Sequence, residues 1–250
     1  MATPLHTRAL RGARLFAGAG DELIERLAQA TTRRSLRRGE HLWRAGDEAT
    51  SFHVITSGLV KICRPEGPGP ATILGLFGPR ESVGDVAVLS QGAYPADAIV
   101  ASDQAEALRI DRNTVLAAMG HAPALSASIH RSVVQHTQIL HQKIQVLSAG
   151  PVERRLATLL LHLAERFGDE MEGGEVVVPV ALSRTELANL VGTTMETTIR
   201  TMSRWQRSGL VETNDDGFVV RRPAELGAIA AGLEPPPASE GSPPSRPDPS

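Results

Sequence analysis

The sequence is poor in cysteine, in aromatic residues and in long apolar runs, and each shortage excludes a class of protein. Cys63 is the single cysteine of 250 residues, which excludes an internal disulfide, and one thiol cannot hold an iron-sulfur cluster or a structural zinc ion. Aromatic residues make up 3%, so we expect an aliphatic core. No apolar run reaches the roughly 18 residues of a membrane span, and residues 1–14 lack the apolar stretch of a signal peptide. We therefore expect a cytoplasmic protein with no membrane partner.

An excess of charge of one sign is also missing. The formal net charge is −2, and the length of 250 residues favours two domains. Any contact with DNA must therefore come from a local basic surface. Nucleophile elbows and paired metal-ligand spacings are absent, and the glycine-rich residues 67–70 lack the Lys and Ser/Thr of a phosphate loop. We expect no enzyme, no catalytic residue and no metal site.

The first half of the sequence has the pattern of a β domain. Residues 31–122 are short Val, Ile and Leu runs separated by glycines, which predicts an antiparallel sandwich or barrel. The clearest strands are 52–55 and 59–62, and we expect them to pair through Thr56-Ser57-Gly58. An amphipathic helix over 16–30, opened by Asp21, precedes them.

A long helix is predicted over 124–149, which contain no glycine or proline. Six of its positions, three or four residues apart, form one stripe: Ile129, Val133, His136, Leu140, Ile144 and Leu147. Such a stripe either packs against the helix's own domain or forms a coiled-coil-like seam with a second copy of the chain. A helix that bridges two domains has little local surface to cover it, which favours a homodimer interface.

The last third of the sequence has the pattern of a winged helix-turn-helix. Ser183-Arg184-Thr185-Glu186 is a capping box that starts a helix, Gly192 makes a sharp turn, and Thr193 or Thr194 caps a second helix that runs to about Arg207. A helix over 152–167 and a β run over 175–178 precede this unit, and a hairpin over 210–220 follows it.

The second helix of this unit carries residues suited to reading bases. Glu196, Ile199, Arg200 and Arg204 can share an outer face. Arg200 suits guanine acceptors, Glu196 a cytosine amino group and Ile199 a thymine methyl. The predicted DNA contacts are Thr194, Met195, Glu196, Ile199, Arg200 and Arg204. The alternative is that Glu196 and Arg200 merely form a salt bridge on a solvated helix.

These residues resemble the CRP/FNR superfamily, named for the cyclic-AMP receptor protein and the fumarate and nitrate reduction regulator. The resemblance covers roughly residues 16–226, and its specificity lies in the order and spacing of motifs at 38–40, 46–47, 52–55, 57–58, 84–87, 152–156, 183–188, 196–200 and 205–209. It implies an α+β fold with an antiparallel β jelly-roll sensor domain (1–122), a dimerisation helix (123–149) and a winged helix-turn-helix (150–232). The Pro- and Ser-rich tail (233–250) should be disordered.

The resemblance also implies a function. Such regulators are homodimers that bind inverted repeats in double-stranded DNA, work with RNA polymerase and respond to a small-molecule or gas effector. Residues at the places of Glu196 and Arg200 read a TGA-like core in that family, whereas Ile199 replaces the serine usual in the oxygen-sensing branch. A protein that binds a ligand without binding DNA is the rival interpretation.

The resemblance places the effector pocket at eight residues: Gly84, Asp85, Val86, Tyr94, Pro95, Ala96, Leu140 and His141. Members that bind cyclic AMP use an acidic residue at the place of Asp85 for the ribose, and an Arg-Ser or Arg-Thr pair for the phosphate. Here Pro95 and Ala96 stand at that pair, and Asp97 would repel an anion. Cyclic AMP is therefore not the expected effector.

The Tyr94-Pro95-Ala96 segment instead resembles the nitric-oxide and denitrification regulators of the superfamily, some of which use haem. The candidate axial ligands are His6, His53, His136, His141 and Met119. A lone histidine is more often a surface or core residue, so haem-dependent gas sensing remains an alternative. Cys63, on a predicted strand, is interpreted as a small buried hydrophobe.

Overall fold

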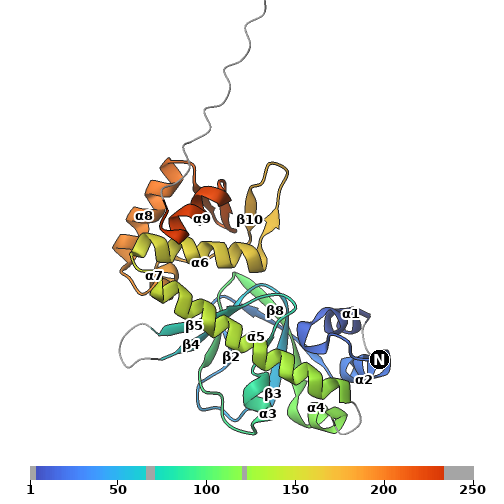
Figure 1. Cartoon of the computed structure of the whole chain (residues 1–250). Coiled ribbons are helices and arrows are strands. Elements are labelled where there is room, and N and C mark those ends of the chain that lie inside the picture. Colours follow the sequence, from blue (N-terminus) through green and yellow to red (C-terminus); the bar gives the residue numbers. More distant parts are fainter. Residues whose placement is uncertain (1–3, 66–70, 120–122, 234–250) are drawn as a thin grey trace, which may run out of the picture.

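Two four-stranded antiparallel sheets form the N-terminal domain of the computed structural model, which describes residues 4–65, 71–119 and 123–233 (Figure 1). One sheet has the order β1 (Thr32–Arg37), β8 (Gln104–Asp111), β3 (Ser51–Ser57), β6 (Ser82–Val83). The other has the order β2 (His41–Trp43), β7 (Asp97–Val100), β4 (Val60–Arg64), β5 (Thr72–Phe77). Apolar side chains from both sheets, among them Phe52 and Ile110 of the first and Val100 of the second, form a largely aliphatic core between them.

The predicted pairing of strands 52–55 and 59–62 is wrong. β3 pairs with β8 and β6, whereas β4 pairs with β5 and β7 in the other sheet. Gly58 lies between them with φ +74°, and a Cβ there would clash with the carbonyl oxygen of Gln104. The glycine thus lets the chain pass from one sheet to the other instead of folding back as a hairpin.

Short helices surround the sandwich. The predicted helix over 16–30 is α2 (Asp21–Gln29), which begins at the expected Asp21, while Phe16 ends a separate 3₁₀ turn, η1 (Arg14–Phe16). The arginine-rich N-terminus, for which no element was predicted, forms α1 (Pro4–Gly12) and buries Leu10. Two further helices, α3 (Asp85–Leu89) and α4 (Arg112–Met119), follow β6 and β8.

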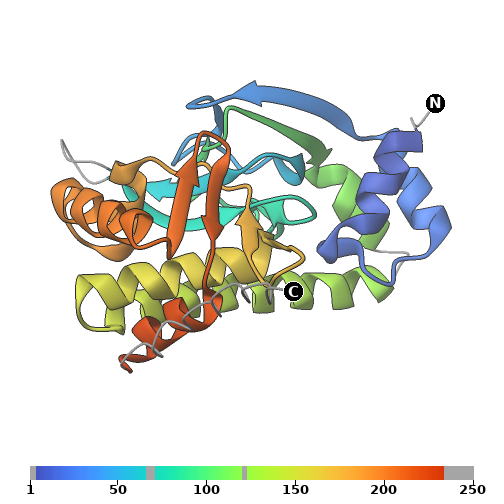
Figure 2. The same ribbon diagram turned by 90° about the horizontal axis from the view of Figure 1, so that it is seen from above.

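A long helix, α5 (Pro123–Ser148), leads from the sandwich to the C-terminal domain (Figure 1). Seen from above, α5 runs beside α6 (Val152–Phe167), the first helix of that domain (Figure 2). Ile139 and Val146 of α5 are buried in the protein interior. The side chains of Met119 and Ile129 lie outside the described residues.

The C-terminal domain is a helix-turn-helix with a small sheet. Its helices are α6, α7 (Arg184–Val191), α8 (Met195–Arg207) and α9 (Pro223–Ala231), and its sheet has the order β11 (Val211–Asn214), β12 (Gly217–Val220), β10 (Val176–Val178), β9 (Asp169–Glu170). The predicted wing is the hairpin of β11 and β12. Helix α9, which was not predicted, packs on α6 and buries Leu226.

The α+β architecture predicted from the sequence is confirmed: a β-sandwich, a long helix and a helix-turn-helix follow one another along the chain (Figure 1). In the described part of the chain no helix is long and apolar enough to cross a membrane. The glycine-rich residues 67–70 lie outside the described residues, as does the predicted tail from residue 234 onward.

Candidate DNA-binding surface and ligand cavity

Local hydrogen bonds fix the two helices of the helix-turn-helix. The Ser183 hydroxyl accepts from the Glu186 backbone N at 3.2 Å, and the Glu186 carboxylate accepts from the Ser183 backbone N at 2.9 Å, which is the predicted capping box. Gly192 ends α7 in the left-handed region at φ +64°. Thr194 then caps α8, its hydroxyl accepting from the Thr197 backbone N at 3.2 Å.

Helix α8 has one buried and one exposed face. Thr198, Met202 and Trp205 are buried against the rest of the domain. The opposite face presents two apolar side chains, Met195 at 51% and Ile199 at 42% exposure. Exposed apolar side chains between polar ones are what a helix needs to touch base edges and methyl groups in a major groove.

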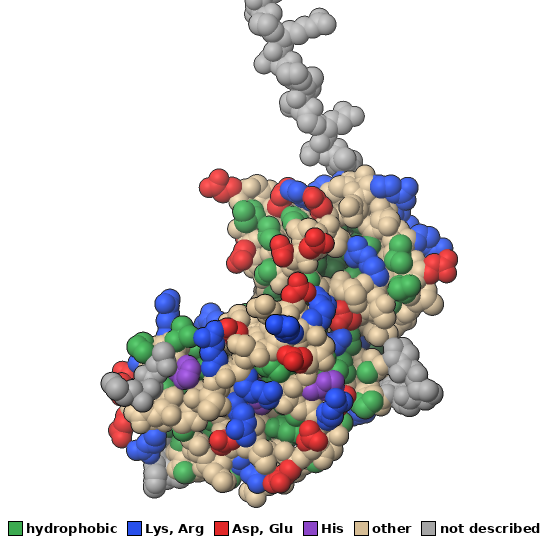
Figure 3. All heavy atoms as spheres, turned by 180° about the vertical axis from the view of Figure 1, so that it is seen from behind, with side chains coloured by type: hydrophobic (Ala, Val, Ile, Leu, Met, Phe, Trp, Pro, Cys, Tyr) green, Lys and Arg blue, Asp and Glu red, His purple; other side chains and the backbone are tan. Residues whose placement is uncertain are grey.

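Glu196 and Arg200 are exposed on the same face of α8. Within the described part of the chain no hydrogen bond or ion pair joins them to each other or to another side chain, so the alternative of a mutual salt bridge finds no support. Figure 3 shows basic side chains along the edge of the C-terminal domain that carries α8. Both groups are therefore free to contact another molecule.

Arg204 is also exposed on α8, but it has an ion-pair partner. Its guanidinium lies 2.6 Å from the Glu153 carboxylate of α6, and the Trp205 indole N–H donates to the same oxygen at 3.2 Å. The Arg204 side chain is nevertheless 54% exposed, so it remains a predicted DNA contact that differs from Glu196 and Arg200 in having an ion-pair partner.

A cavity of about 270 Å³ lies between the sandwich, α3 and α5. Seven of the residues predicted for the effector pocket line it: Gly84, Asp85, Val86, Tyr94, Pro95, Ala96 and Leu140. His141 does not, because it follows Leu140 by one position, a turn of about 100°, and is exposed. The polar residue that α5 does place at the cavity is His136, which the sequence had assigned to the dimer stripe.

The floor of the cavity is a cluster around Asp85, whose side chain is 1% exposed. The Asp85 Oδ2 accepts from the Ser82 hydroxyl at 3.0 Å and from the Ser132 hydroxyl of α5. Asp85 Oδ1 has no hydrogen-bond partner, and His136 Nε2 lies 3.7 Å from it. The cluster ties α3 to α5 and leaves one carboxylate oxygen unsatisfied.

Aromatic rings form one wall of the cavity. The rings of Trp43 and Tyr94 stack with centroids 4.3 Å apart at 15°. Each is anchored by its polar atom, since Trp43 Nε1 donates to the Ala96 carbonyl at 2.9 Å and the Tyr94 hydroxyl donates to the Ser51 carbonyl. Among the described residues no lysine or arginine lines the cavity, so a phosphate would find no arginine there.

The candidate haem ligands do not gather around one site. His136 lines the cavity, whereas His53 is buried in the sandwich behind Trp43 with ring centroids 5.6 Å apart. His6 lies on α1 and His141 is exposed. The described residues therefore offer a haem no converging pair of axial ligands. They also hold no group of three or more His, Cys, Asp or Glu side chains that could bind a metal ion.

The stripe on α5 is largely uncovered. Val133, Leu140, Ile144 and Leu147 are all exposed large hydrophobic residues. His136 departs from it, since it turns toward the cavity and its ring lies 5.5 Å from that of Phe77. Leu140 belongs to both features, because it is exposed on the stripe and lines the cavity.

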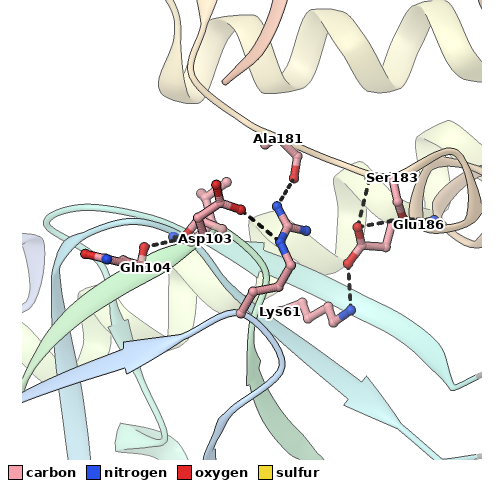
Figure 4. A network of polar contacts seen from close by, with 9 residues as sticks. Lys61, Asp103, Gln104, Ala181, Ser183 and Glu186 are labelled. Atoms are coloured by element: carbon pink, nitrogen blue, oxygen red, sulfur yellow. Dashed lines mark hydrogen bonds and ion pairs between the residues drawn. The ribbon is translucent and has the colours of Figure 1, made fainter. Parts of the chain in front are cut away.

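Polar bridges that no sequence pattern predicts join the two domains (Figure 4). Lys61 of β4 donates from Nζ to the Glu186 carboxylate at 2.6 Å. Arg38 reaches the Ala181 carbonyl at 3.5 Å and also pairs with Asp103 at 3.1 Å. These partners lie far apart in the chain, so no local pattern could have found them.

Two more basic side chains extend this interface. Lys143 of α5 donates to the Leu190 carbonyl at the end of α7 at 2.7 Å, and burial lowers the pKa of its amine to about 8. Arg166 of α6 donates to the buried Glu81 carboxylate of the sandwich at 2.9 Å. Apolar residues of both domains, among them Cys63 and Leu187, form one shared cluster. The burial that makes Cys63 part of that cluster raises the pKa of its thiol to about 11.

Comparison with known proteins matches both halves of the chain. A model of the cyclic nucleotide-binding domain matches residues 33–121, and a model of the Crp-like helix-turn-helix domain matches residues 154–229. Together the two models span about two thirds of the chain.

Two similar proteins are regulators rather than enzymes, as predicted. The "CRP-like cAMP-activated global transcriptional regulator" of Mycobacterium tuberculosis is 26% identical over 84% of this chain and 93% of that protein. The "Transcriptional activator protein anr" of Pseudomonas aeruginosa is 27% identical over 85% of this chain and 83% of that protein. The solved structure of FixK2 from Bradyrhizobium japonicum has the same fold, with a TM-score of 0.69 at 18% identity, over 83% of this chain and 99% of that one.

Proposed function

We propose that the chain is a DNA-binding transcription regulator of the CRP/FNR family that works as a homodimer and reads an inverted repeat under the control of a ligand bound in the cavity. The observation that carries this proposal is the exposed, unpaired Glu196 and Arg200 on the capped helix α8. A guanidinium and a carboxylate one turn apart match donor and acceptor groups of base pairs in the major groove.

The exposed stripe on α5 supports the homodimer. Val133, Leu140 and Ile144 would remain in water in a monomer, and a second copy of the same helix is the simplest surface that covers them. A two-fold axis through this seam would present two α8 helices to successive major grooves on one face of the duplex. The half-sites would then have centres about 34 Å apart.

The cavity supports ligand control, because it lies where the sandwich meets the dimer helix. Asp85 of α3 binds Ser132 of α5, and Leu140 reaches from the cavity wall onto the stripe. A bound ligand can therefore act on α5 directly. We propose that this ligand is not cyclic AMP, because the described lining residues offer its phosphate no arginine or lysine.

Two finer proposals rest on the family and on sequence likeness. RNA polymerase is the proposed second macromolecular partner, because a regulator of this family acts on transcription. The likeness of Tyr94-Pro95-Ala96 to nitric-oxide and denitrification regulators rests on the sequence of this segment.

Selection of bound duplexes from a random pool tests the proposed function. The full-length protein should enrich an inverted repeat with half-sites one helical turn apart. Gel shifts on that duplex should show a single shifted band, in which one dimer binds one duplex. Enrichment of no sequence at all, with equal binding to every duplex, would overturn the proposal.

A further inference from the structure

We propose that the cavity binds a compact amine, an ammonium or amino group carried on an apolar body. This inference rests on the proposed function in one respect only, which is that the same cavity is the effector site. The argument comes from the acceptors on its floor, the apolar and aromatic walls and the volume.

The first step is the unsatisfied oxygen of Asp85. The carboxylate is 1% exposed, its Oδ2 already accepts from two serine hydroxyls, and its Oδ1 accepts from none. An ionised carboxylate buried without full hydrogen bonding is unfavourable, and a donor at Oδ1 would relieve this. A ligand with a hydrogen-bond donor would therefore satisfy the Asp85 Oδ1 at the floor of the cavity.

The second step is the orientation of His136. Its Nδ1 lies 2.9 Å from the Ser132 backbone carbonyl. A carbonyl can only accept, so the hydrogen bond assigns the proton of a neutral ring to Nδ1 and leaves Nε2 as an acceptor. Nε2 lies 3.7 Å from Asp85 Oδ1. With the ring neutral, two acceptors thus lie side by side at the cavity, and one nitrogen with two or three N–H groups can donate to both.

The third step is the character of the walls. The stacked Trp43 and Tyr94, together with Ile62, Phe77 and Leu140, make a mostly apolar lining. Aromatic rings attract cations. An anion would be repelled by Asp85, and the described lining residues include no arginine or lysine to neutralise its charge. The lining favours an amine on an apolar body over a carboxylate or phosphate of the same size.

The fourth step is size. A volume of about 270 Å³ lies near the lower end for ligand pockets. The cavity has room for one ring with a short side chain, and a bulky ligand would have to displace Leu140 or Val86 at its exposed edge.

Calorimetry on the full-length protein tests the inference with 2-phenylethylamine as the probe and phenylacetate as its anionic match of nearly equal size. The amine should bind, and phenylacetate and cyclic AMP should bind at least about tenfold more weakly. Asp85→Asn should weaken the amine at least about tenfold, while Glu25→Gln, which changes an exposed carboxylate on α2, should leave it unchanged.

A second variant keeps the test sharp if Asp85→Asn does not fold. Val86→Phe enlarges an exposed residue at the cavity and leaves the buried floor intact, so it too should weaken the amine. The inference is overturned if the amine does not bind at millimolar concentration, if phenylacetate binds as tightly, or if a folded Asp85→Asn binds the amine as the unmodified protein does. Gel shifts on the selected duplex with the same samples test the proposed function separately.

Discussion

Lys61 of the sandwich and Glu186 of the helix-turn-helix, 125 residues apart in the chain, form an ion pair at 2.6 Å. The other oxygen of the same carboxylate accepts from Ser183, so one residue both caps α7 and joins it to β4 (Figure 4). Burial alone would raise the pKa of the Glu186 carboxyl, but hydrogen bonds from Lys61 and Ser183 outweigh burial and lower it. This pair is therefore one of the polar contacts that hold the two domains together.

Removing the cation should loosen that contact. Lys61→Met keeps an apolar stem of similar length and leaves the buried Glu186 carboxylate without its cationic partner, which should lower the free energy of unfolding by about 2 kcal/mol. Urea unfolding measures the change. Arg64→Met, on the same strand but exposed, is the matched control and should have little effect. An equal loss in both variants would show that the ion pair contributes nothing specific.

His53 should make stability depend on pH. Burial, with Arg34 and Arg109 nearby, lowers the pKa of its imidazole to about 3, from 6.5. Between these values the unfolded chain binds a proton that the folded protein does not, so stability must fall as the pH falls below about 6.5. His53→Leu removes this dependence, and its advantage over the unmodified protein should grow by up to about 1.4 kcal/mol per pH unit.

Urea unfolding at a series of pH values checks this prediction. At neutral pH the variant should match the unmodified protein within about 1 kcal/mol, because neither ring nitrogen of His53 has a hydrogen bond to lose. His141→Gln, at an exposed position, should leave the pH profile unchanged. Parallel profiles for His53→Leu and the unmodified protein would contradict the account.

Charges in the α5 stripe should abolish the dimer. Val133→Glu combined with Ile144→Glu places like charges on both sides of a two-fold seam while avoiding Leu140, which also lines the cavity. Sedimentation should show a dimer for the unmodified protein and a monomer for the variant. Gln138→Glu with Gln145→Glu, two exposed positions outside the stripe, should remain dimeric. A monomeric unmodified protein at micromolar concentration would contradict the predicted seam.

The parts that could be predicted from the sequence are those with local signals. The capping box at Ser183, the left-handed Gly192 and the Thr194 cap each act within four residues, so the helices α7 and α8 were placed from their sequences. Helix α6 was predicted over 152–167, and the structure gives the same bounds because Pro151 and Gly168 flank it.

The parts that could not be predicted depend on distant partners. β3 pairs with β8, about 50 residues further on, and β4 pairs with β7, about 40 residues further on. The glycine turn between β3 and β4 carries no information on these pairings, so it resembles the turn of a hairpin. His136 and Leu140 lie four positions apart on one helix, so their spacing alone places both on the stripe. Only the position of Asp85 shows that His136 faces the cavity. The ion pair of Arg204 with Glu153 joins two helices that are distant in the chain, so no local pattern indicates it.

The most direct test of the central claim is the affinity of Arg200→Ala for the selected inverted repeat and for a scrambled duplex at the same salt concentration. Arg200 is exposed on α8 and free of partners among the described residues, so its loss should cost about 1 to 3 kcal/mol on the matched site and much less on the scrambled one. Arg207→Ala, at an exposed position on the same helix, should weaken both duplexes alike, as expected of a phosphate contact. Equal losses on both duplexes for Arg200→Ala would show that α8 does not read the bases through this residue.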